Sequence, residues 1–168
     1  MNIQLTPAQK DDLAYIVAVY NQAITTRLAT ADLTPITVES RLTWFAQHQD
    51  YKHPLWLIQR GNEVVGWASL SSFYGRPAYQ QTVEVSIYID PAYQGQKIGS
   101  AALQQVIQQA QLRSMTTLLA FVFSHNLPSL TLFEKAGFEA WGKLPGVAYL
   151  DDQEACDLTI LGKKIRQD

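Results

Sequence analysis

The segment that most constrains the fold is an alternating run of eight residues, Thr82–Ile89. Its apolar residues recur at every second position, which is the period of a strand with one buried face. Asp90-Pro91 ends the run, and a polar turn with two glycines follows at 94–99. Residues 100–112 then place apolar side chains at helical spacing. This part of the chain therefore predicts a strand, a tight turn and a helix in succession.

Weaker patterns of the same kinds surround this unit. Gly61-Asn62 predicts a hairpin turn. Strands are expected over 2–6, 55–59, 64–73, 116–123, 138–144 and 154–161, and helices over 8–23, 37–48 and 128–137. We therefore expect an α/β fold, with a mixed and mostly antiparallel sheet flanked by helices, in a single domain spanning residues 1–168.

Composition limits the partners. The formal net charge is −2 and the Lys and Arg residues are spread along the chain, which argues against a nucleic-acid or anionic membrane surface. The single cysteine, Cys156, permits no intramolecular disulfide and fits a reducing compartment. No signal peptide is visible, because Asp11 and Asp12 precede any apolar run. We expect a cytoplasmic protein without nucleic-acid, membrane or metal partners.

The turn Gln94–Ser100 has the features of an anion site. Its glycines allow several N–H groups to face one point, and the following helix adds its positive N-terminal end. A pyrophosphate would suit such a site. The turn lacks the Gly-Lys-Ser/Thr of a Walker loop, and it comes too late in the chain for a dinucleotide fingerprint. On the turn alone, the alternative that Gly95 and Gly99 only shape a tight connection stays open.

The order of short motifs along most of the chain resembles that of the GCN5-related N-acetyltransferases, in the branch with phosphinothricin and methionine sulfone/sulfoximine acetyltransferases. These motifs are Val19-Tyr20-Asn21, Ala29-Thr30, Arg41 with Trp44-Phe45, Val65-Gly66-Trp67-Ala68, Arg76 with Tyr79, Thr82-Val83-Glu84, the turn 94–99, Asn126-x-x-Ser129, Phe133-Glu134 and Ala136-Gly137-Phe138. The resemblance implies the acyl-CoA N-acyltransferase fold with splayed central strands. It also implies a homodimer and transfer of an acetyl group from acetyl-CoA to the primary amine of a small molecule, such as an amino acid or its analogue.

The resemblance also implies which residues hold the cofactor. Main-chain N–H groups of the turn would bind the pyrophosphate, and the strand before it would pair with the pantetheine arm and face the thioester oxygen. The family's usual glycine is Lys97 here, so Lys97 must adopt a compatible backbone. The implied set is Ile87, Tyr88, Ile89, Gly95, Gln96, Lys97, Ile98, Gly99, Ser100, Asn126 and Lys135.

The implied catalytic residue is Glu84. An amine with a pKa near 10 is mostly protonated at pH 7, so a base must remove a proton before it can attack. Arg76 would meet a substrate carboxylate through a forked pair of hydrogen bonds. The implied substrate-binding set is Tyr74, Arg76, Tyr79, Glu84, Val85 and Ser86.

The general acid is not assigned by the resemblance, because Phe133 stands where many members have Tyr or His. Water could protonate the leaving thiolate, and the other candidates are Tyr74, Tyr79, Tyr88 and His125. Phe133 also motivates one alternative function, a non-catalytic CoA-binding module. A second alternative, acetylation of peptide N-termini, is open because it uses the same fold.

Overall fold

The computed structural model describes residues 1–151 and 154–166. The predicted single domain over 1–168 also includes residues 152, 153, 167 and 168, which lie outside the described part of the chain. The strands are β1 (Ile3–Pro7), β2 (Leu55–Arg60), β3 (Glu63–Ser72), β4 (Thr82–Ile89), β5 (Thr117–Phe123), β6 (Glu139–Tyr149) and β7 (Ala155–Lys164). The α-helices are α1 (Leu13–Ile24), α2 (Leu42–Ala46), α3 (Ile98–Leu112) and α4 (Leu127–Lys135).

All seven strands join in one sheet with the order β1-β2-β3-β4-β5-β7-β6. Neighbouring strands are antiparallel except for the central pair β4 and β5, which is parallel. A parallel connection needs a crossover, and α3 supplies it between these two strands. The predicted mixed and mostly antiparallel sheet is confirmed.

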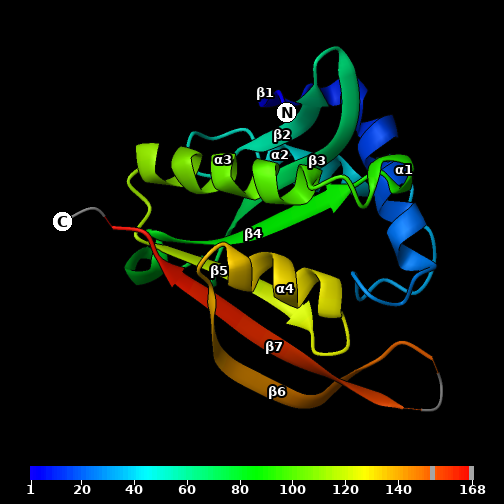
Figure 1. Ribbon diagram of the computed structural model, residues 1–168, viewed down its shortest axis with the longest axis vertical. Helices are drawn as coiled ribbons and strands as arrows, with labels where there is room; N and C mark the ends of the chain where they lie inside the picture. Colours follow the sequence, from blue (N-terminus) through cyan, green and yellow to red (C-terminus); the bar gives the residue numbers. More distant parts are fainter. Residues whose placement is uncertain (152–153, 167–168) are drawn as a thin grey trace.

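The two central strands pair over only part of their length. Thr82–Glu84 of β4 lie beside Thr117–Leu119 of β5. Beyond this point β4 continues to Ile89 and β5 to Phe123 without pairing to each other. Both strands run toward the N-terminal ends of α3 and α4 (Figure 1). The predicted splay is therefore present, and it opens at the end of the sheet where these two helices begin.

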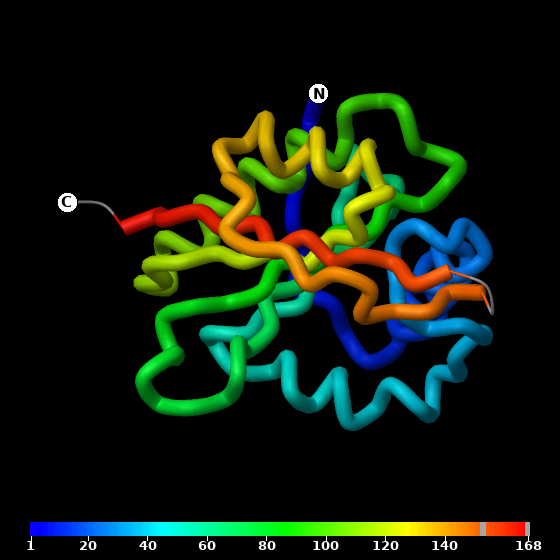
Figure 2. Tube along the Cα trace, turned by 90° about the horizontal axis from the view of Figure 1, so that it is seen from below, coloured from blue at the N-terminus to red at the C-terminus, as the bar shows by residue number. Residues whose placement is uncertain are grey.

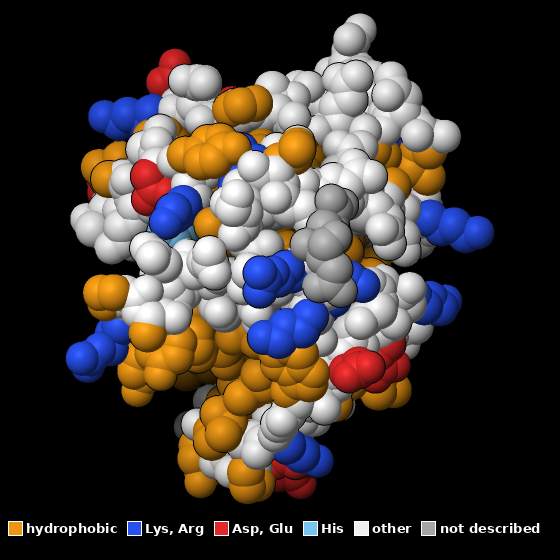
Figure 3. Space-filling view, turned by 90° about the vertical axis from the view of Figure 1, so that its left-hand side faces the viewer, with side chains coloured by type: hydrophobic (Ala, Val, Ile, Leu, Met, Phe, Trp, Pro, Cys, Tyr) orange, Lys and Arg blue, Asp and Glu red, His pale blue; other side chains and the backbone are white. Residues whose placement is uncertain are grey.

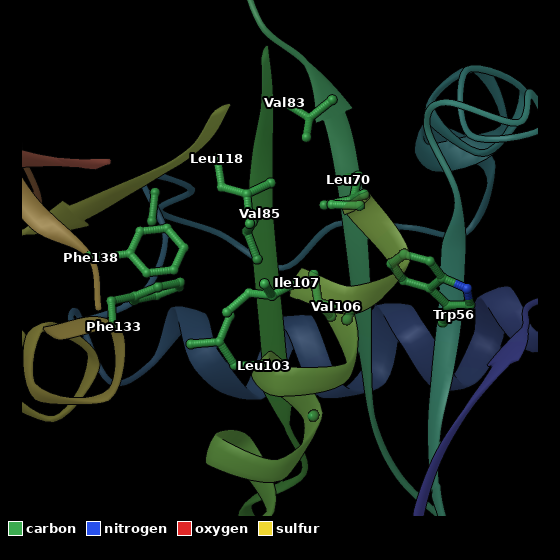
Figure 4. Packing of buried hydrophobic residues seen from close by; sticks show 14 of the residues in the cluster. Trp56, Leu70, Val83, Val85, Leu103, Val106, Ile107, Leu118, Phe133 and Phe138 are labelled. Carbon is green, nitrogen blue, oxygen red and sulfur yellow. The ribbon is translucent and has the colours of Figure 1, made fainter. Parts of the chain in front are cut away.

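Helices cover both faces of the sheet, with α3 and α4 on one side and α1 and α2 on the other (Figure 2). The larger core cluster lies under α3, where Val83 and Val85 of β4 meet Leu103 and Val106 (Figure 4). The smaller cluster packs α1 against β2 and Trp67 of β3. The apolar residues of β4 thus face α3, which leaves its polar residues facing α1 and α2.

The helix predicted over 37–48 is shorter in the structure. Thr37 Oγ1 accepts a hydrogen bond from the Ser40 N–H at 3.2 Å, a 3-10 turn covers Glu39–Arg41, and α2 ends at Ala46. The Trp44 carbonyl would accept the His48 N–H if the helix continued. It is 2.8 Å from His48 Nδ1 instead, so a side chain competes with the backbone at this point.

The last two strands extend beyond their predicted ends at residues 144 and 161. β6 passes through Pro145 and Gly146, and its pairing with β7 shifts between Ala140 and Gly142 and between Leu144 and Ala148. A proline is tolerated there because β6 is the edge strand of the sheet. Within the described ranges, no helix is both long and apolar enough to cross a bilayer.

Candidate active site

The turn between β4 and α3 has the backbone that an anion site requires. Gly95 has a φ of +76° and Lys97, the residue before α3, has a φ of +62°. Lys97 therefore adopts the left-handed conformation that glycine takes at little steric cost. The first N–H groups of α3 have no acceptor within the helix. The predicted turn thus lies at the positive end of a helix of 15 residues, next to N–H groups that have no acceptor within that helix.

A groove runs beside this turn, and we call it the helix-end groove. Residues of α1, β4, the turn and the start of α4 line it. Of the predicted cofactor-binding residues, it contains Ile87, Tyr88, Ile89, Gly95, Lys97, Ile98, Gly99, Ser100 and Asn126. Gln96 and Lys135 do not line it: Gln96 Oε1 accepts a hydrogen bond from Arg60 at 2.6 Å, and Lys135 is the last residue of α4. The groove therefore gathers most of the predicted set.

The space between the splayed strands, called here the splayed-strand cleft, continues from the helix-end groove. Its walls are Glu84–Tyr88 of β4 and Ala120–Phe123 of β5, and Phe133 of α4 also lines it. Ile87, Tyr88 and Asn126 line both cavities. A long ligand whose anionic end sat at the turn could therefore extend between the two strands.

A third cavity, of about 220 Å³, lies on the α1 and α2 side of β4, and we call it the aromatic pocket. Its lining is Ile16, Val17, Tyr20, Ile36, Arg41, Trp44, Trp67, Ser71, Glu84, Ser86 and Tyr88. Three of these residues, Glu84, Ser86 and Tyr88, also line the splayed-strand cleft. The polar face of β4 is therefore the junction of the two spaces.

Glu84 lies at this junction and is half-buried. Burial raises the pKa of its carboxyl group above the ordinary value. Among the described residues, no hydrogen bond or salt bridge to its side chain is found. A carboxylate that is partly desolvated and unpaired is a stronger base than one in water, which suits removal of a proton from an amine.

Arg41 supplies the positive charge of the aromatic pocket. Its guanidinium lies over the ring of Tyr20 at 4.7 Å and is 3.5 Å from a carboxylate oxygen of Asp32. The Tyr20 hydroxyl bonds both Asp32 and Thr30. In the sequence, Arg41 and Trp44 stand out only as parts of one motif. Their spacing of three residues puts both on one side of a helical turn, which was the available signal for a shared site.

The predicted acid candidates lie in different surroundings. Phe133 is buried and packs edge-on against Phe138, with ring centroids 5.0 Å apart. Tyr88 Oη donates to the Ala29 carbonyl at 3.1 Å, and His125 Nε2 donates to the Arg27 carbonyl at 2.8 Å. Tyr88 lines all three cavities, and burial raises the pKa of its hydroxyl, so it stays protonated. Tyr88 is thus the candidate whose position suits a proton donor.

Asn126 fixes the junction of the groove and the cleft. It is buried, its Oδ1 accepts the Ser129 N–H at 3.2 Å, and its Nδ2 donates to the Leu28 carbonyl at 3.1 Å. The first bond caps α4, and the second ties that helix to the loop after α1. Its side chain therefore holds two walls of the cavity together.

The predicted substrate residues divide into two groups. Val85 and Ser86 line the splayed-strand cleft with Glu84, although the Val85 side chain also packs in the core under α3. Tyr74, Arg76 and Tyr79 lie in the exposed loop before β4 and line none of the three cavities. Tyr74 and Tyr79 pack on Phe73, which stacks on Phe121 of the cleft with ring centroids 6.4 Å apart. The loop therefore borders the cleft from outside.

Comparison with known proteins identifies the family. The family model of the acetyltransferase (GNAT) family matches residues 17–138, which is most of the chain. The chain belongs to this family. Its predicted fold and its predicted class of enzyme, an acetyltransferase, are both confirmed.

The relatives share nearly the whole chain. YwnH from Bacillus subtilis (strain 168), which carries the provisional description phosphinothricin acetyltransferase, is 46% identical over 94% of this chain and 96% of its own. The L-methionine sulfoximine/L-methionine sulfone acetyltransferase of Salmonella typhimurium (strain LT2) is 29% identical over 83% of this chain and 82% of its own.

Solved structures agree with the sequence comparison. The structure of yncA from Salmonella typhimurium, which holds its cofactor acetyl-CoA, has a TM-score of 0.86 and 26% identity, covering 99% of this chain and 95% of its own. Acetyl-CoA carries a pyrophosphate and a long thioester arm. The helix-end groove offers N–H groups for the first and the splayed-strand cleft offers room for the second, so the residues present fit this cofactor. No cluster of three His, Cys, Asp or Glu side chains suited to a metal occurs in the described ranges.

Proposed function

We propose that this acetyltransferase moves the acetyl group of acetyl-CoA to the primary amine of a small amino-acid-like molecule, with Glu84 as the general base. The observation that carries the proposal is the position of Glu84, half-buried and unpaired in the described chain, where the aromatic pocket meets the splayed-strand cleft. The relatives named for phosphinothricin and methionine sulfoximine, both amino-acid analogues, support this class of acceptor.

The proposed binding of acetyl-CoA follows the cavities. Gly95 and the residues from Lys97 to Ser100 would hold the pyrophosphate, and the β4 segment Ile87–Ile89 would pair with the pantetheine arm. Gln96 and Lys135, which do not line the groove, remain proposed contacts. Bound in this way, acetyl-CoA would supply an activated acetyl group next to Glu84.

The steps proposed for the protein's own residues begin with the acceptor. The aromatic pocket would hold the amine beside Glu84, which removes one proton so that nitrogen gains a free lone pair. Trp44, Trp67 and Tyr88 form aromatic walls of this space. We propose Tyr88 as the donor that protonates the leaving sulfur, because its side chain lines the junction; its hydroxyl proton, which the Ala29 carbonyl accepts in this structure, would turn toward the sulfur.

The size of the aromatic pocket supports a small acceptor rather than a peptide N-terminus. A space of about 220 Å³ behind Glu84 suits a single amino-acid side chain. A non-catalytic module has less support, because Glu84 and Tyr88 line the junction of the cavities, where they would act as base and proton donor despite Phe133.

We also propose that the protein forms a homodimer. The exposed apolar side chains of β6 are Trp141, Leu144, Val147 and Tyr149. Figure 3 shows hydrophobic side chains gathered on the lower part of the molecule, where β6 and β7 lie in Figure 1. An exposed apolar edge strand supports association with a second copy.

The proposed activity is tested by CoA release from acetyl-CoA with L-methionine sulfoximine, L-methionine sulfone, phosphinothricin and common L-amino acids as acceptors. Glu84→Gln is expected to lower kcat by about 10²–10⁴-fold. It should keep the rise in melting temperature that acetyl-CoA causes in the wild-type protein. Glu139→Gln, an exposed carboxylate on β6, is the matched control. Wild-type protein that turns over no acceptor, or a fully active Glu84→Gln variant, would contradict the proposal.

A further inference from the structure

His48 occupies a buried site next to the aromatic pocket, with 6% of its surface exposed. Its Nδ1 is 2.8 Å from the Trp44 carbonyl and its Nε2 is 3.0 Å from Ser71 Oγ. A carbonyl oxygen can only accept a hydrogen bond, so Nδ1 carries the ring proton. Burial lowers the pKa of His48, which keeps the ring neutral at pH 7 and leaves Nε2 as an acceptor.

This arrangement fixes the direction of the Ser71 hydroxyl. A serine has one hydroxyl proton, and His48 Nε2 needs it. Ser71 Oγ must therefore donate toward His48, so that its oxygen lone pairs remain for other groups. Because Ser71 also lines the aromatic pocket, it can offer the pocket an acceptor and no donor.

Ser71 stands directly across the β3–β4 ladder from Glu84, and both line the aromatic pocket. Opposite residues of an antiparallel pair have Cβ atoms about 4.5–5.5 Å apart on the same face. An ionised carboxylate is also an acceptor only. This end of the pocket thus holds two neighbouring acceptors. An ammonium group, with three N–H donors and no lone pair, complements such a pair.

We propose that Ser71, oriented by His48, is a positioning residue that accepts one N–H of the acceptor amine while Glu84 takes the proton of another. This inference rests on the proposed function and deepens it. With one N–H held by Ser71, the nitrogen cannot rotate freely, and the lone pair freed by Glu84 points in a fixed direction. A purely structural Ser71, present only to satisfy His48, would affect stability but not the affinity for the amine.

The test compares Ser71→Ala with Ser71→Thr, which keeps the hydroxyl, and with Ser72→Ala, which removes the exposed neighbour on the other face of β3. A hydrogen bond to a charged group is worth roughly 1.5–3 kcal/mol. The KM for the amine should therefore rise about 10–100-fold in Ser71→Ala, with KM for acetyl-CoA unchanged. Ser71→Thr should return the amine KM to within about threefold of wild type, and Ser72→Ala should leave both KM values unchanged.

His48→Phe adds a second arm. Without the Nε2 acceptor the Ser71 hydroxyl can rotate, so this variant should raise the amine KM in the wild-type background and have no further effect in Ser71→Ala. Thermal melts with acetyl-CoA establish that each variant is folded. An unchanged amine KM in Ser71→Ala, or an equal rise for both substrates, would overturn the inference while the proposed function stands. Wild-type protein without turnover of any acceptor would overturn both.

Discussion

Glu84 and Ser71 are register partners on adjacent strands, and the same pocket contacts both side chains. Ser71 is uncharged and does not neutralise the carboxylate of Glu84. The folded-state pKa of Glu84 is therefore raised by burial. The unfolded chain has an ordinary Glu pKa of about 4.3. The folded protein therefore binds more protons over the interval between the two pKa values, and Glu84 lowers stability as pH rises through its folded pKa.

Glu84→Gln should accordingly melt at a higher temperature than wild type at pH 7–8, because no charge is buried. The difference should shrink as pH falls and disappear at about pH 3, where Glu84 is protonated in both states. Melting curves from about pH 3 to pH 8 measure this. Glu139→Gln, on the exposed edge strand, should show no such trend. A variant that is less stable than wild type at pH 8 would contradict the role of burial.

Replacing Lys97 with glycine should stabilise the protein. The left-handed conformation costs a non-glycine residue about 1–2 kcal/mol, and glycine avoids this cost. Glycine also lowers stability by about 0.5–1 kcal/mol, because it loses more conformational freedom on folding. The expected net gain in free energy of unfolding is up to about 1 kcal/mol, measured by urea titration. Ser114 has a φ of +60° far from the turn, so Ser114→Gly should give a similar gain and serves as the matched comparison. Lys97→Val should lose stability, because a β-branched residue adopts the left-handed conformation least readily. A gain in stability would contradict the inferred backbone strain at Lys97.

Asn126→Ala should destabilise the fold by about 2 kcal/mol, since it removes the cap of α4 and leaves the Leu28 carbonyl without its donor. Asn126→Ser can still cap the helix but cannot reach both partners. It should recover only the capping part, about 1 kcal/mol. Denaturant unfolding of the two variants separates the contributions. Equal stability of the two variants would show that the cap contributes nothing, and an Asn126→Ser variant as stable as wild type would show that the bond to Leu28 contributes nothing.

Arg76 and Arg41 are the two candidate partners for a carboxylate on the acceptor. Arg76→Met is expected to raise KM about tenfold for L-amino acids and to leave KM unchanged for the matching amines without a carboxylate. Arg41→Met provides the contrast, because Arg41 lines the aromatic pocket and Arg76 does not. If only Arg41→Met removes the preference for a carboxylate, the Arg76 assignment is wrong and the carboxylate lies in the pocket.

The proposed homodimer predicts that wild-type protein elutes and scatters light at twice the mass of 18.9 kDa. Val147→Asp places a charge among the exposed apolar residues of β6 and should shift the equilibrium toward the monomer. Leu112→Asp, at the exposed C-terminal end of α3, is the matched control and should remain dimeric. A monomeric wild-type protein at high micromolar concentration would refute the dimer.

Much of this protein follows from local sequence. The alternation in Thr82–Ile89 was enough to predict which side of β4 faces the core, because strand geometry puts successive side chains on opposite faces. The turn after it was also predictable, since its glycines and the following helix act over a few residues. The left-handed Lys97 followed from the family pattern rather than from propensity, which disfavours it.

The aromatic pocket was decided by tertiary structure. Arg41, Ser71 and Glu84 come from three separate segments, and no periodicity within one segment shows that they meet. The early end of α2 depends on His48 bonding both Trp44 and Ser71, the latter 23 residues away. The sequence alone therefore determined most of the elements and the turn before α3. Only long-range packing determined the shape of the acceptor site, the burial of Glu84 and the direction of the Ser71 hydroxyl.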